Sequence, residues 1–313
     1  MDFLYSNIYL QFAMLAVGFA MLSFGADWFV DGAAGLAAKL GIPQLIIGLT
    51  IVAMGTSAPE AAVSITSACK GVADITVGNI LGSNILNILI ILGLASLILP
   101  LPVGASTYKI EIPFMIAISI LLYVEGLDGT ISRTDGLILL ACFAIYLLYC
   151  IYQAKQGGEE VEEEHAEKNI FKLVFLLLFG LVVIVYGSEV TVTAATNIAK
   201  SFCVSERVIG LTIVAFGTSL PELFTSCIAA KKGDVGIAIG NIVGSNIFNI
   251  LFVIGLSSMI IDVPYAKAFL FDSYATIGSA ILLWIFVLTS KRLERWEGAA
   301  MLMAYAVYLY SIL

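Results

Sequence analysis

Two short motifs place glutamate, hydroxyl groups and proline inside hydrophobic sequence. They read GLTIVAMGTSAPE at residues 48–60 and GLTIVAFGTSLPE at residues 210–222. In the first motif Thr56 and Glu60 stand four positions apart with Ser57 between them, so a continuous helix would place the threonine and the glutamate on one face. All three side chains offer oxygen, which is the ligand atom that hard cations such as Ca²⁺ and Na⁺ prefer. The pattern therefore indicates a cation site.

The second motif repeats the same groups as Thr218, Ser219 and Glu222. A carboxylate at the centre of a bilayer costs roughly 2.5–3.5 kcal/mol, so Glu60 and Glu222 together oppose folding by about 5–7 kcal/mol unless something compensates. Two carboxylates match the charge of one divalent cation. Neither motif contains cysteine or histidine, which disfavours softer metals. A kinked helix with a buried glutamate is also compatible with a purely architectural role, but the repetition favours the site.

The prolines of the two motifs predict breaks in the helices. Pro59 and Pro221 lack an N–H group, and each ring crowds the carbonyl four residues earlier, at Gly55 and Gly217. Carbonyls freed at membrane depth are tolerated only where they face protein or a hydrated cavity. There they become available as further ligands.

A second repeated motif follows each of the first, as GNILGSNILNILIILG at 78–93 and GNIVGSNIFNILFVIG at 240–255. Each contains amide and hydroxyl side chains four positions apart on one stripe, namely Asn79, Ser83 and Asn87, and Asn241, Ser245 and Asn249. The paired glycines, Gly78 with Gly82 and Gly240 with Gly244, are expected to let helix backbones approach closely. We expect Asn84 and Asn246, one residue off the stripe, to bond to helix backbone rather than to ions.

The composition is that of a polytopic helical membrane protein, because 60% of the 313 residues are hydrophobic and only 12% are charged. The first apolar run has no preceding basic region and no cleavage pattern, so it is interpreted as a span and not a signal peptide. Hydrophobic runs predict ten helices, at 8–37, 44–69, 74–98, 111–124, 134–152, 170–199, 207–230, 235–260, 270–289 and 297–313.

The ten predicted helices form two copies of five. At an offset of 162 residues, 11 of 13 positions of the first motif and 11 of 16 of the second are identical. Because five crossings separate equivalent points, the second copy enters the membrane from the opposite side, which makes an inverted repeat. The expected units are an N-terminal repeat at 1–152, an acidic linker at 153–169 and a C-terminal repeat at 170–313.

Charge gives an expected orientation. With the N-terminus outside, ten Lys and Arg residues fall in inside loops and five in outside loops, which favours both termini outside. The acidic linker, EEVEEEHAEK at 159–168, then lies in the cytoplasm. We interpret it as a solvated connection, with weak calcium sensing as the alternative. The small size suggests a prokaryotic cell membrane.

Several other classes of function are disfavoured. No basic patch supports nucleic-acid binding. The five cysteines have no CxxC pairing and are expected to be small buried hydrophobic residues. The one histidine, His165, lies in the acidic linker, so a zinc site or a catalytic Ser-His pair in the membrane is not expected, and an intramembrane enzyme using Ser57 has no base. Asp27, Asp31 and Glu189 are expected to form contacts between helices rather than to line an ion path.

The paired motifs, GTSAPE with GSNILN and GTSLPE with GSNIFN, resemble the two alpha repeats of the cation/calcium antiporter superfamily, in particular the compact prokaryotic members of its sodium/calcium exchanger branch. The resemblance covers essentially the whole chain. It implies ten helices, cation sites clustered at the midplane, and alternating access by sliding of the first helix of each half. It implies no cofactor. The partners that it implies are Ca²⁺, Na⁺ and the lipid bilayer, and it leaves protein partners open.

The resemblance also implies a ligand set. The family's side-chain ligands fall on Thr56, Ser57, Glu60, Ser83, Asn87, Thr218, Ser219, Glu222, Ser245 and Asn249, joined by backbone carbonyls near Ala53 and Ala215. Potassium-dependent relatives, and some prokaryotic members, carry Asp where this chain has Asn249, and the Asn argues against potassium dependence. Proton-coupled relatives carry a GN motif before the acidic residue, and its absence here favours sodium.

These observations predict an antiporter in which Ca²⁺ and Na⁺ compete for ligands centred on Glu60 and Glu222. The alternatives are a proton/calcium antiporter on the same scaffold and a channel. Two glutamates that face each other in a medium of low dielectric do not both ionise readily, so protons are expected to compete with calcium.

Overall fold

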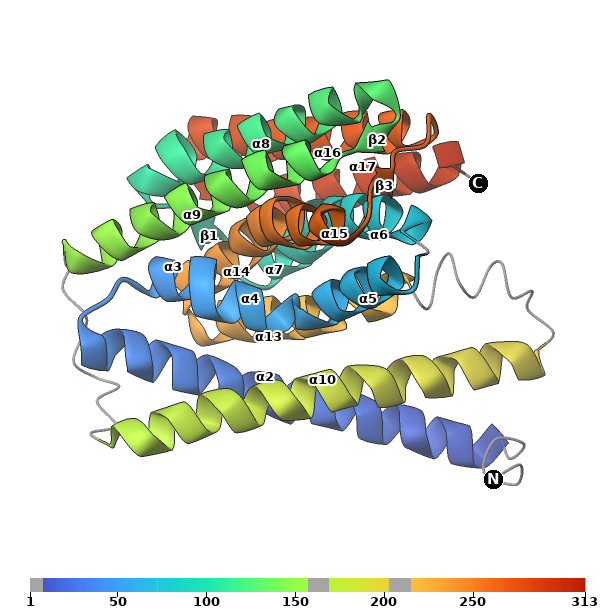
Figure 1. Cartoon of the computed structure of the whole chain (residues 1–313). Helices are drawn as coiled ribbons and strands as arrows, with labels where there is room; N and C mark the ends of the chain where they lie inside the picture. The colour runs from blue at the N-terminus through green and yellow to red at the C-terminus, as the bar shows by residue number, and fades with distance from the viewer. Residues whose placement is uncertain (1–7, 72, 157–168, 203–214, 313) are drawn as a thin grey trace.

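A computed structural model describes residues 8–71, 73–156, 169–202 and 215–312. Most of the predicted linker, with His165, and the start of the second GLTIV motif, residues 210–214, lie outside the described residues, as does Cys203. The chain is built almost entirely from helices (Figure 1).

The first half follows the predicted spans closely. In chain order its elements are α2 (Ile8–Leu40), α3 (Gln44–Ile47), the π-helical η1 (Gly48–Val52), α4 (Ala53–Thr56), α5 (Ala58–Cys69), α6 (Asp74–Leu86), the π-helical η2 (Asn87–Leu92), α7 (Gly93–Ile98), β1 (Leu101–Pro102), the π-helical η3 (Thr107–Glu111), α8 (Ile112–Glu125), the 3-10 turn η4 (Gly126–Asp128), β2 (Thr130–Ile131) and α9 (Arg133–Lys155). The fourth predicted span is longer than expected, because η3 and η4 extend α8 at both ends.

The second half repeats this order. Its described elements are α10 (Ile170–Ser201), α12 (Ala215–Gly217), α13 (Leu220–Lys232), α14 (Val235–Phe248), the π-helical η7 (Asn249–Ile254), α15 (Gly255–Ile260), β3 (Val263–Pro264), α16 (Phe269–Ser290), β4 (Arg292–Leu293) and α17 (Arg295–Ile312). The π-helical segments η2 and η7 begin at Asn87 and Asn249, two positions related by the repeat offset.

Several helices are long and apolar enough to cross a membrane. Within the described residues there are seven, or eight if the pair Gln44–Thr56 and Ala58–Cys69, bent by 49°, counts as one span. Ten spans were predicted. In the described part α13 has 13 residues and α17 begins with Arg295 and Glu297, and neither belongs to this set.

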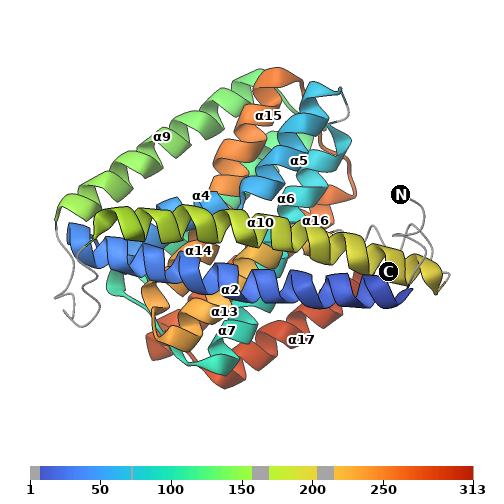
Figure 2. The same cartoon turned by 90° about the horizontal axis from the view of Figure 1, so that it is seen from below.

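The two longest helices, α2 and α10, cross on one side of the bundle (Figures 1 and 2). Glycines bring their backbones together: a Cβ atom on Gly25 would lie 2.9 Å from the Ile184 nitrogen, and one on Gly180 would lie 2.6 Å from the Phe29 nitrogen. Small residues permit such close approach between helices in a membrane. The pair therefore packs through close backbone contacts at its glycines, together with side-chain contacts such as that of Trp28 with Phe179, whose ring centroids lie 5.4 Å apart.

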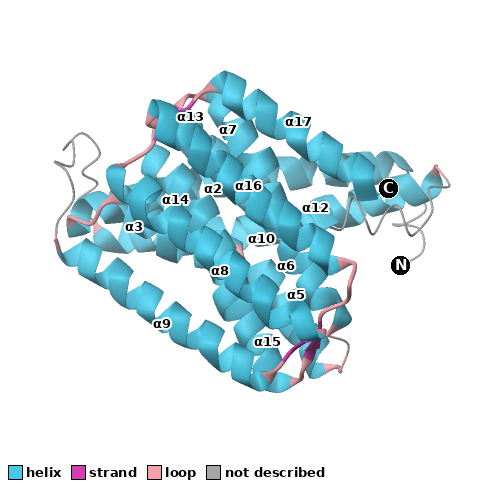
Figure 3. Cartoon of the chain, turned by 90° about the horizontal axis from the view of Figure 1, so that it is seen from above, coloured by secondary structure: helices cyan, strands magenta, loops and turns pink. Residues whose placement is uncertain are grey.

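The α6–α7 and α14–α15 segments are the most buried of the candidate spans. Figure 1 shows them between the α2–α10 pair and the layer that contains α8 and α16, and α8 and α16 lie in front in the view of Figure 3. The predicted close approach of glycines is confirmed at α14, where a Cβ atom on Gly240 would lie 2.6 Å from the Leu45 carbonyl oxygen and one on Gly244 would lie 2.5 Å from that of Leu49. The equivalent partners of Gly78 and Gly82 would be residues 207 and 211, which lie outside the described residues.

Two small features differ from an all-helical expectation. Strands β1 and β4 pair antiparallel, with Leu101 opposite Leu293, and β2 and β3 pair with Ile131 opposite Val263. Each pair joins one loop of the first half to one loop of the second. The offset of 162 residues relates β1 to β3 and β2 to β4, so each pair is the repeat equivalent of the other.

The prediction that the cysteines are buried holds for Cys150 but is wrong for Cys69, which is exposed because it lies at the end of α5.

Candidate metal centre

The two glutamates lie in the first turns of the helices that follow the predicted breaks. Ser57, with φ −81° and ψ 7°, separates α4 from α5, whose first turn contains Pro59 and Glu60. Ser219, with φ −90° and ψ 5°, precedes α13 in the same way, and Glu222 lies in its first turn. The partial positive charge at a helix N-terminus stabilises a carboxylate there. The broken helix is thus the local structure that makes a buried glutamate tolerable.

Each glutamate contacts the opposite half of the molecule. The Ser57 hydroxyl donates to Glu222 Oε1 over 2.7 Å, and the Ser219 hydroxyl donates to Glu60 Oε1 over 3.3 Å. Both glutamates are at most 1% exposed. The structure therefore brings the two predicted carboxylates together in one buried place between the halves.

The threonines differ between the two halves. Thr56 donates its hydroxyl to Asn241 Oδ1 over 2.9 Å, and the Asn241 amide donates in turn to Ser226 over 2.9 Å. The Thr218 hydroxyl oxygen is buried and has no hydrogen-bond partner among the described residues. Asn241 was expected on the amide stripe, whereas Ser226 was missed. The sequence does contain a signal for Ser226, because the repeat offset relates it to Ser64, which accepts a hydrogen bond from Asn79 in the first half.

The backbone carbonyls are only partly as predicted. The Ala53 carbonyl lies in the cluster, where it accepts from the Ser245 hydroxyl over 3.4 Å. Ala215 begins α12, and its surroundings belong to the part of the chain that is not described. The carbonyl of Gly217 was expected to be free as a ligand, but it accepts a hydrogen bond of 2.7 Å from Ser188 on α10.

The stripe of the central helices completes the cluster. The Ser83 and Ser219 hydroxyl oxygens lie 3.3 Å apart, and this contact links α6 to the start of α13. Asn87 and Asn249 are at most 1% exposed, and their Oδ1 atoms have no partner among the described residues. As expected, Asn84 and Asn246 bond to backbone: each side-chain amide donates over 3.2 Å to the other's carbonyl oxygen.

Five predicted ligands thus hold a buried oxygen without a hydrogen-bond partner in the described part of the chain, namely Glu60 Oε2, Glu222 Oε2, Asn87 Oδ1, Asn249 Oδ1 and Thr218 Oγ1. An unsatisfied buried polar atom costs about 1–3 kcal/mol, and more when it is charged. The described residues contain no cluster of three or more His, Cys, Asp or Glu side chains. The donor set is therefore carboxylate, amide and hydroxyl oxygen, which fits a hard cation.

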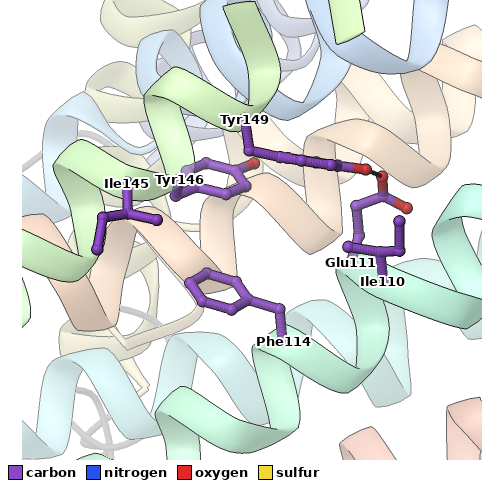
Figure 4. A pocket seen from close by; sticks show the side chains of 6 residues that line it. All are labelled: Ile110, Glu111, Phe114, Ile145, Tyr146 and Tyr149. Carbon is purple, nitrogen blue, oxygen red and sulfur yellow. Dashed lines mark hydrogen bonds between the residues drawn. The ribbon is translucent and has the colours of Figure 1, made fainter. Parts of the chain in front are cut away.

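The surrounding helices support the broken segment from outside the cluster. A cavity of about 200 Å³ between η3, α8 and α9 is lined by apolar side chains, by Tyr146 and by Glu111, whose carboxylate bonds to Tyr149 (Figure 4). The Tyr146 hydroxyl donates over 3.0 Å to the carbonyl oxygen of Leu49, within η1. The tyrosine thus satisfies a carbonyl close to the helix break.

The predicted contacts between helices are confirmed for two of the three acidic residues. Lys232 at the end of α13 lies 2.7 Å from Asp27 and 2.6 Å from Asp31, both on α2. Glu189 on α10 forms no ion pair among the described residues. The helix that carries Glu222 is therefore tied to α2 by charge.

Comparisons with known proteins agree with the arrangement. The family described as sodium/calcium exchanger protein matches residues 10–152 and 172–313. The sodium/calcium exchanger MaX1 of Methanosarcina acetivorans is 31% identical, over 96% of this chain and 98% of its own length, and the inner membrane protein YrbG of Escherichia coli strain K12 is 38% identical, over 87% and 88%. A structure of the sodium-calcium exchanger NCX_Mj soaked with Na⁺ and Sr²⁺ matches with a TM-score of 0.86 and 33% identity, over 97% of this chain and 99% of that chain.

Proposed function

The chain belongs to the sodium/calcium exchanger family, and from this premise we propose that it exchanges Na⁺ for Ca²⁺ across a membrane through a single buried site between its two halves. The family and the apolar helices make it a membrane transporter of cations. The coupling to sodium and the location of the site are the proposal.

One observation carries the site. Five oxygens of five predicted ligands are buried without a partner among the described residues, and two of them belong to glutamates that reach across to the opposite half. A cation bound between them compensates both the charge and the missing hydrogen bonds. The proposed ligands are Thr56, Ser57, Glu60, Ser83, Asn87, Thr218, Ser219, Glu222, Ser245, Asn249 and the carbonyls of Ala53 and Ala215.

Competition for these ligands couples the two ions. One Ca²⁺ neutralises the two carboxylates, whereas three Na⁺, the number that the family resemblance suggests, leave one net positive charge. Such an exchange is electrogenic, and each net charge that crosses corresponds to about 2.3 kcal/mol per 100 mV. A negative interior then drives calcium out. The absence of a GN motif before Glu60 and Glu222 favours sodium over protons as the coupling ion.

We further propose the ten-helix inverted repeat, with units at 1–152 and 170–313 joined by an acidic linker at 153–169. Reciprocal contacts support it, since the strand pairs and the bonds between Asn84 and Asn246 exchange under the offset of 162 residues. In this arrangement α13 with the residues before it, and α17, are the two remaining spans.

For the orientation we propose that both termini lie outside and the linker lies in the cytoplasm of a prokaryotic cell, on the distribution of Lys and Arg. The crossed pair α2 and α10 is the element proposed to slide against the rest of the bundle. Its glycine-lined contact supports this role, because the close approach of the two backbones allows the pair to move as one unit.

The experiment is counter-flow of radioactive calcium in proteoliposomes, with Na⁺, K⁺ and H⁺ gradients imposed one at a time. We expect uptake to follow the sodium gradient only and to disappear in Glu60→Gln and Glu222→Gln. Calcium uptake that ignores sodium and follows an imposed pH gradient would instead identify a proton/calcium antiporter. Flux that needs no counter-ion would identify a channel.

A further inference from the structure

Four buried asparagines meet where the two central helices cross. Asn84 and Asn246 each donate the side-chain amide to the other's backbone carbonyl, over 3.2 Å in both directions. Asn87 donates to Asn246 Oδ1 over 3.0 Å, and Asn249 donates to Asn84 Oδ1 over 3.1 Å. All four side chains are at most 1% exposed.

This chain of bonds fixes the direction of every amide in it. A backbone carbonyl can only accept, so the nitrogen of Asn84 must face Asn246, and its oxygen must face Asn249. Asn249 can therefore present only its nitrogen to Asn84, since two oxygens would repel each other. By the same reasoning, Asn246 turns its nitrogen to the Asn84 carbonyl and its oxygen to Asn87, so Asn87 must present its nitrogen to Asn246.

Asn87 and Asn249 stand at the two ends of this chain of bonds, and the fixed direction leaves the side-chain oxygen of each without a partner in it. The Oδ1 atoms of Asn87 and Asn249 are the ends that carry no hydrogen bond among the described residues. Both residues are also the first of a π-helical segment, a local irregularity that is frequent at functional sites. A reversed amide would instead turn hydrogens with partial positive charge toward a bound cation.

We propose that Asn84 and Asn246 are positioning residues, which hold the amide oxygens of Asn249 and Asn87 toward the transported cation and keep their NH₂ groups away from it. The inference rests on the proposed function, because it takes Asn87 and Asn249 as ligands. It adds a crossed pairing: each positioning residue acts on the ligand of the opposite half. Replacing a residue that orients a metal ligand through a hydrogen bond typically lowers metal affinity by about 10- to 100-fold.

If Asn84 and Asn246 only packed the two helices together, their bonds to backbone would be explained, but replacing Asn84 would not affect calcium binding through one particular ligand. A double-mutant cycle separates the two roles. Calcium affinity is measured by calorimetry on purified protein for Asn84→Ala, Asn249→Ala, Asn87→Ala and the two doubles that contain Asn84→Ala. Ser96→Ala is the matched control, because the one hydrogen bond that its buried hydroxyl forms among the described residues goes to the Gly93 carbonyl within its own helix.

We expect Asn84→Ala to weaken calcium binding about 10-fold or more and Ser96→Ala to leave it within about twofold. The double variant of Asn84→Ala with Asn249→Ala should bind calcium no more weakly than Asn249→Ala alone. The double variant with Asn87→Ala should show the full additional loss of calcium affinity that Asn84→Ala causes by itself. Additive losses in both cycles, or unchanged affinity in Asn84→Ala, would overturn the positioning role. If Asn84→Ala does not fold, Asn84→Ser takes its place in the same cycles.

The proposed function is judged separately, on the wild-type protein. If the wild type binds no calcium, the proposed function and the positioning role both fail. If calcium binds but sodium does not displace it, the exchange with sodium is wrong, and the cycles still decide the positioning role. If wild-type binding is displaced by sodium and the cycles are additive, only the positioning role is wrong.

Discussion

The contact between α14 and the broken helix of the first half controls the width of the proposed site, and Gly244→Ala tests it. An added Cβ atom would lie 2.5 Å from the Leu49 carbonyl oxygen and 2.8 Å from the Ala53 Cβ atom. Ordinary contact begins at 3.4 Å, so the two helices must separate by roughly 0.9 Å. The next residue, Ser245, would then move away from the Ala53 carbonyl oxygen that it now reaches at 3.4 Å.

A displacement of this size matters because calcium ligands lie within a narrow range, about 2.3–2.6 Å from the ion. Inserting a methyl group into a well-packed core costs about 1–3 kcal/mol. Without calcium the helices relieve that strain by moving apart, and binding must draw them together again. We therefore expect calcium affinity to fall by about 5- to 150-fold, the factor that corresponds to 1–3 kcal/mol.

The assay is calorimetric calcium binding together with thermal unfolding in detergent. Gly278→Ala on α16 is the matched control, since among the described residues no atom beyond the adjoining part of its own helix lies within 4 Å of its added Cβ atom. It should leave affinity unchanged. If folded Gly244→Ala binds calcium within about twofold of the wild type, the close approach of α14 does not set the geometry of the site, and the reasoning is refuted.

Three further predictions concern protons and the supporting contacts. Calcium affinity should fall as the pH is lowered from neutral to mildly acidic, because protonation removes the negative charge that Glu60 and Glu222 offer; a flat profile would contradict it. Tyr146→Phe leaves the Leu49 carbonyl without its hydroxyl donor and should lower the free energy of unfolding by about 1–3 kcal/mol, measured by thermal or denaturant unfolding; an unchanged value would show that the bond is not needed. Lys232→Met removes half-exposed ion pairs worth about 0–1 kcal/mol, so the exchange rate in vesicles should change by at most about fivefold, and complete loss of exchange would mean that Lys232 does more than tie α13 to α2.

Much of the helical arrangement could be predicted from sequence because it follows from local rules. The apolar runs gave the bounds 44–69 and 235–260, and Pro59 and Pro221 gave the positions of the breaks. The repeat offset related Glu60 to Glu222 without any structure. These features depend on hydrophobicity, proline geometry and repetition, all of which are visible in one chain.

The remainder depends on contacts between distant segments. The Gly217 carbonyl accepts from Ser188, and the Leu49 carbonyl accepts from Tyr146, and neither pair has a spacing that a sequence pattern reveals. The direction of the Asn87 amide follows from a bond to Asn246, 159 positions away. Predicting the residue types of the proposed site was therefore possible, whereas predicting the direction in which each side chain offers its oxygen was not.

The most direct test of a shared site is equilibrium binding of radioactive calcium to the purified protein, titrated with sodium, in the wild type, Glu60→Gln and Glu222→Gln. We expect sodium to displace calcium competitively in the wild type, and calcium binding to be lost in both variants although they remain folded. Calcium that stays bound at saturating sodium, or that binds normally to either variant, would contradict a single oxygen site shared by the two ions.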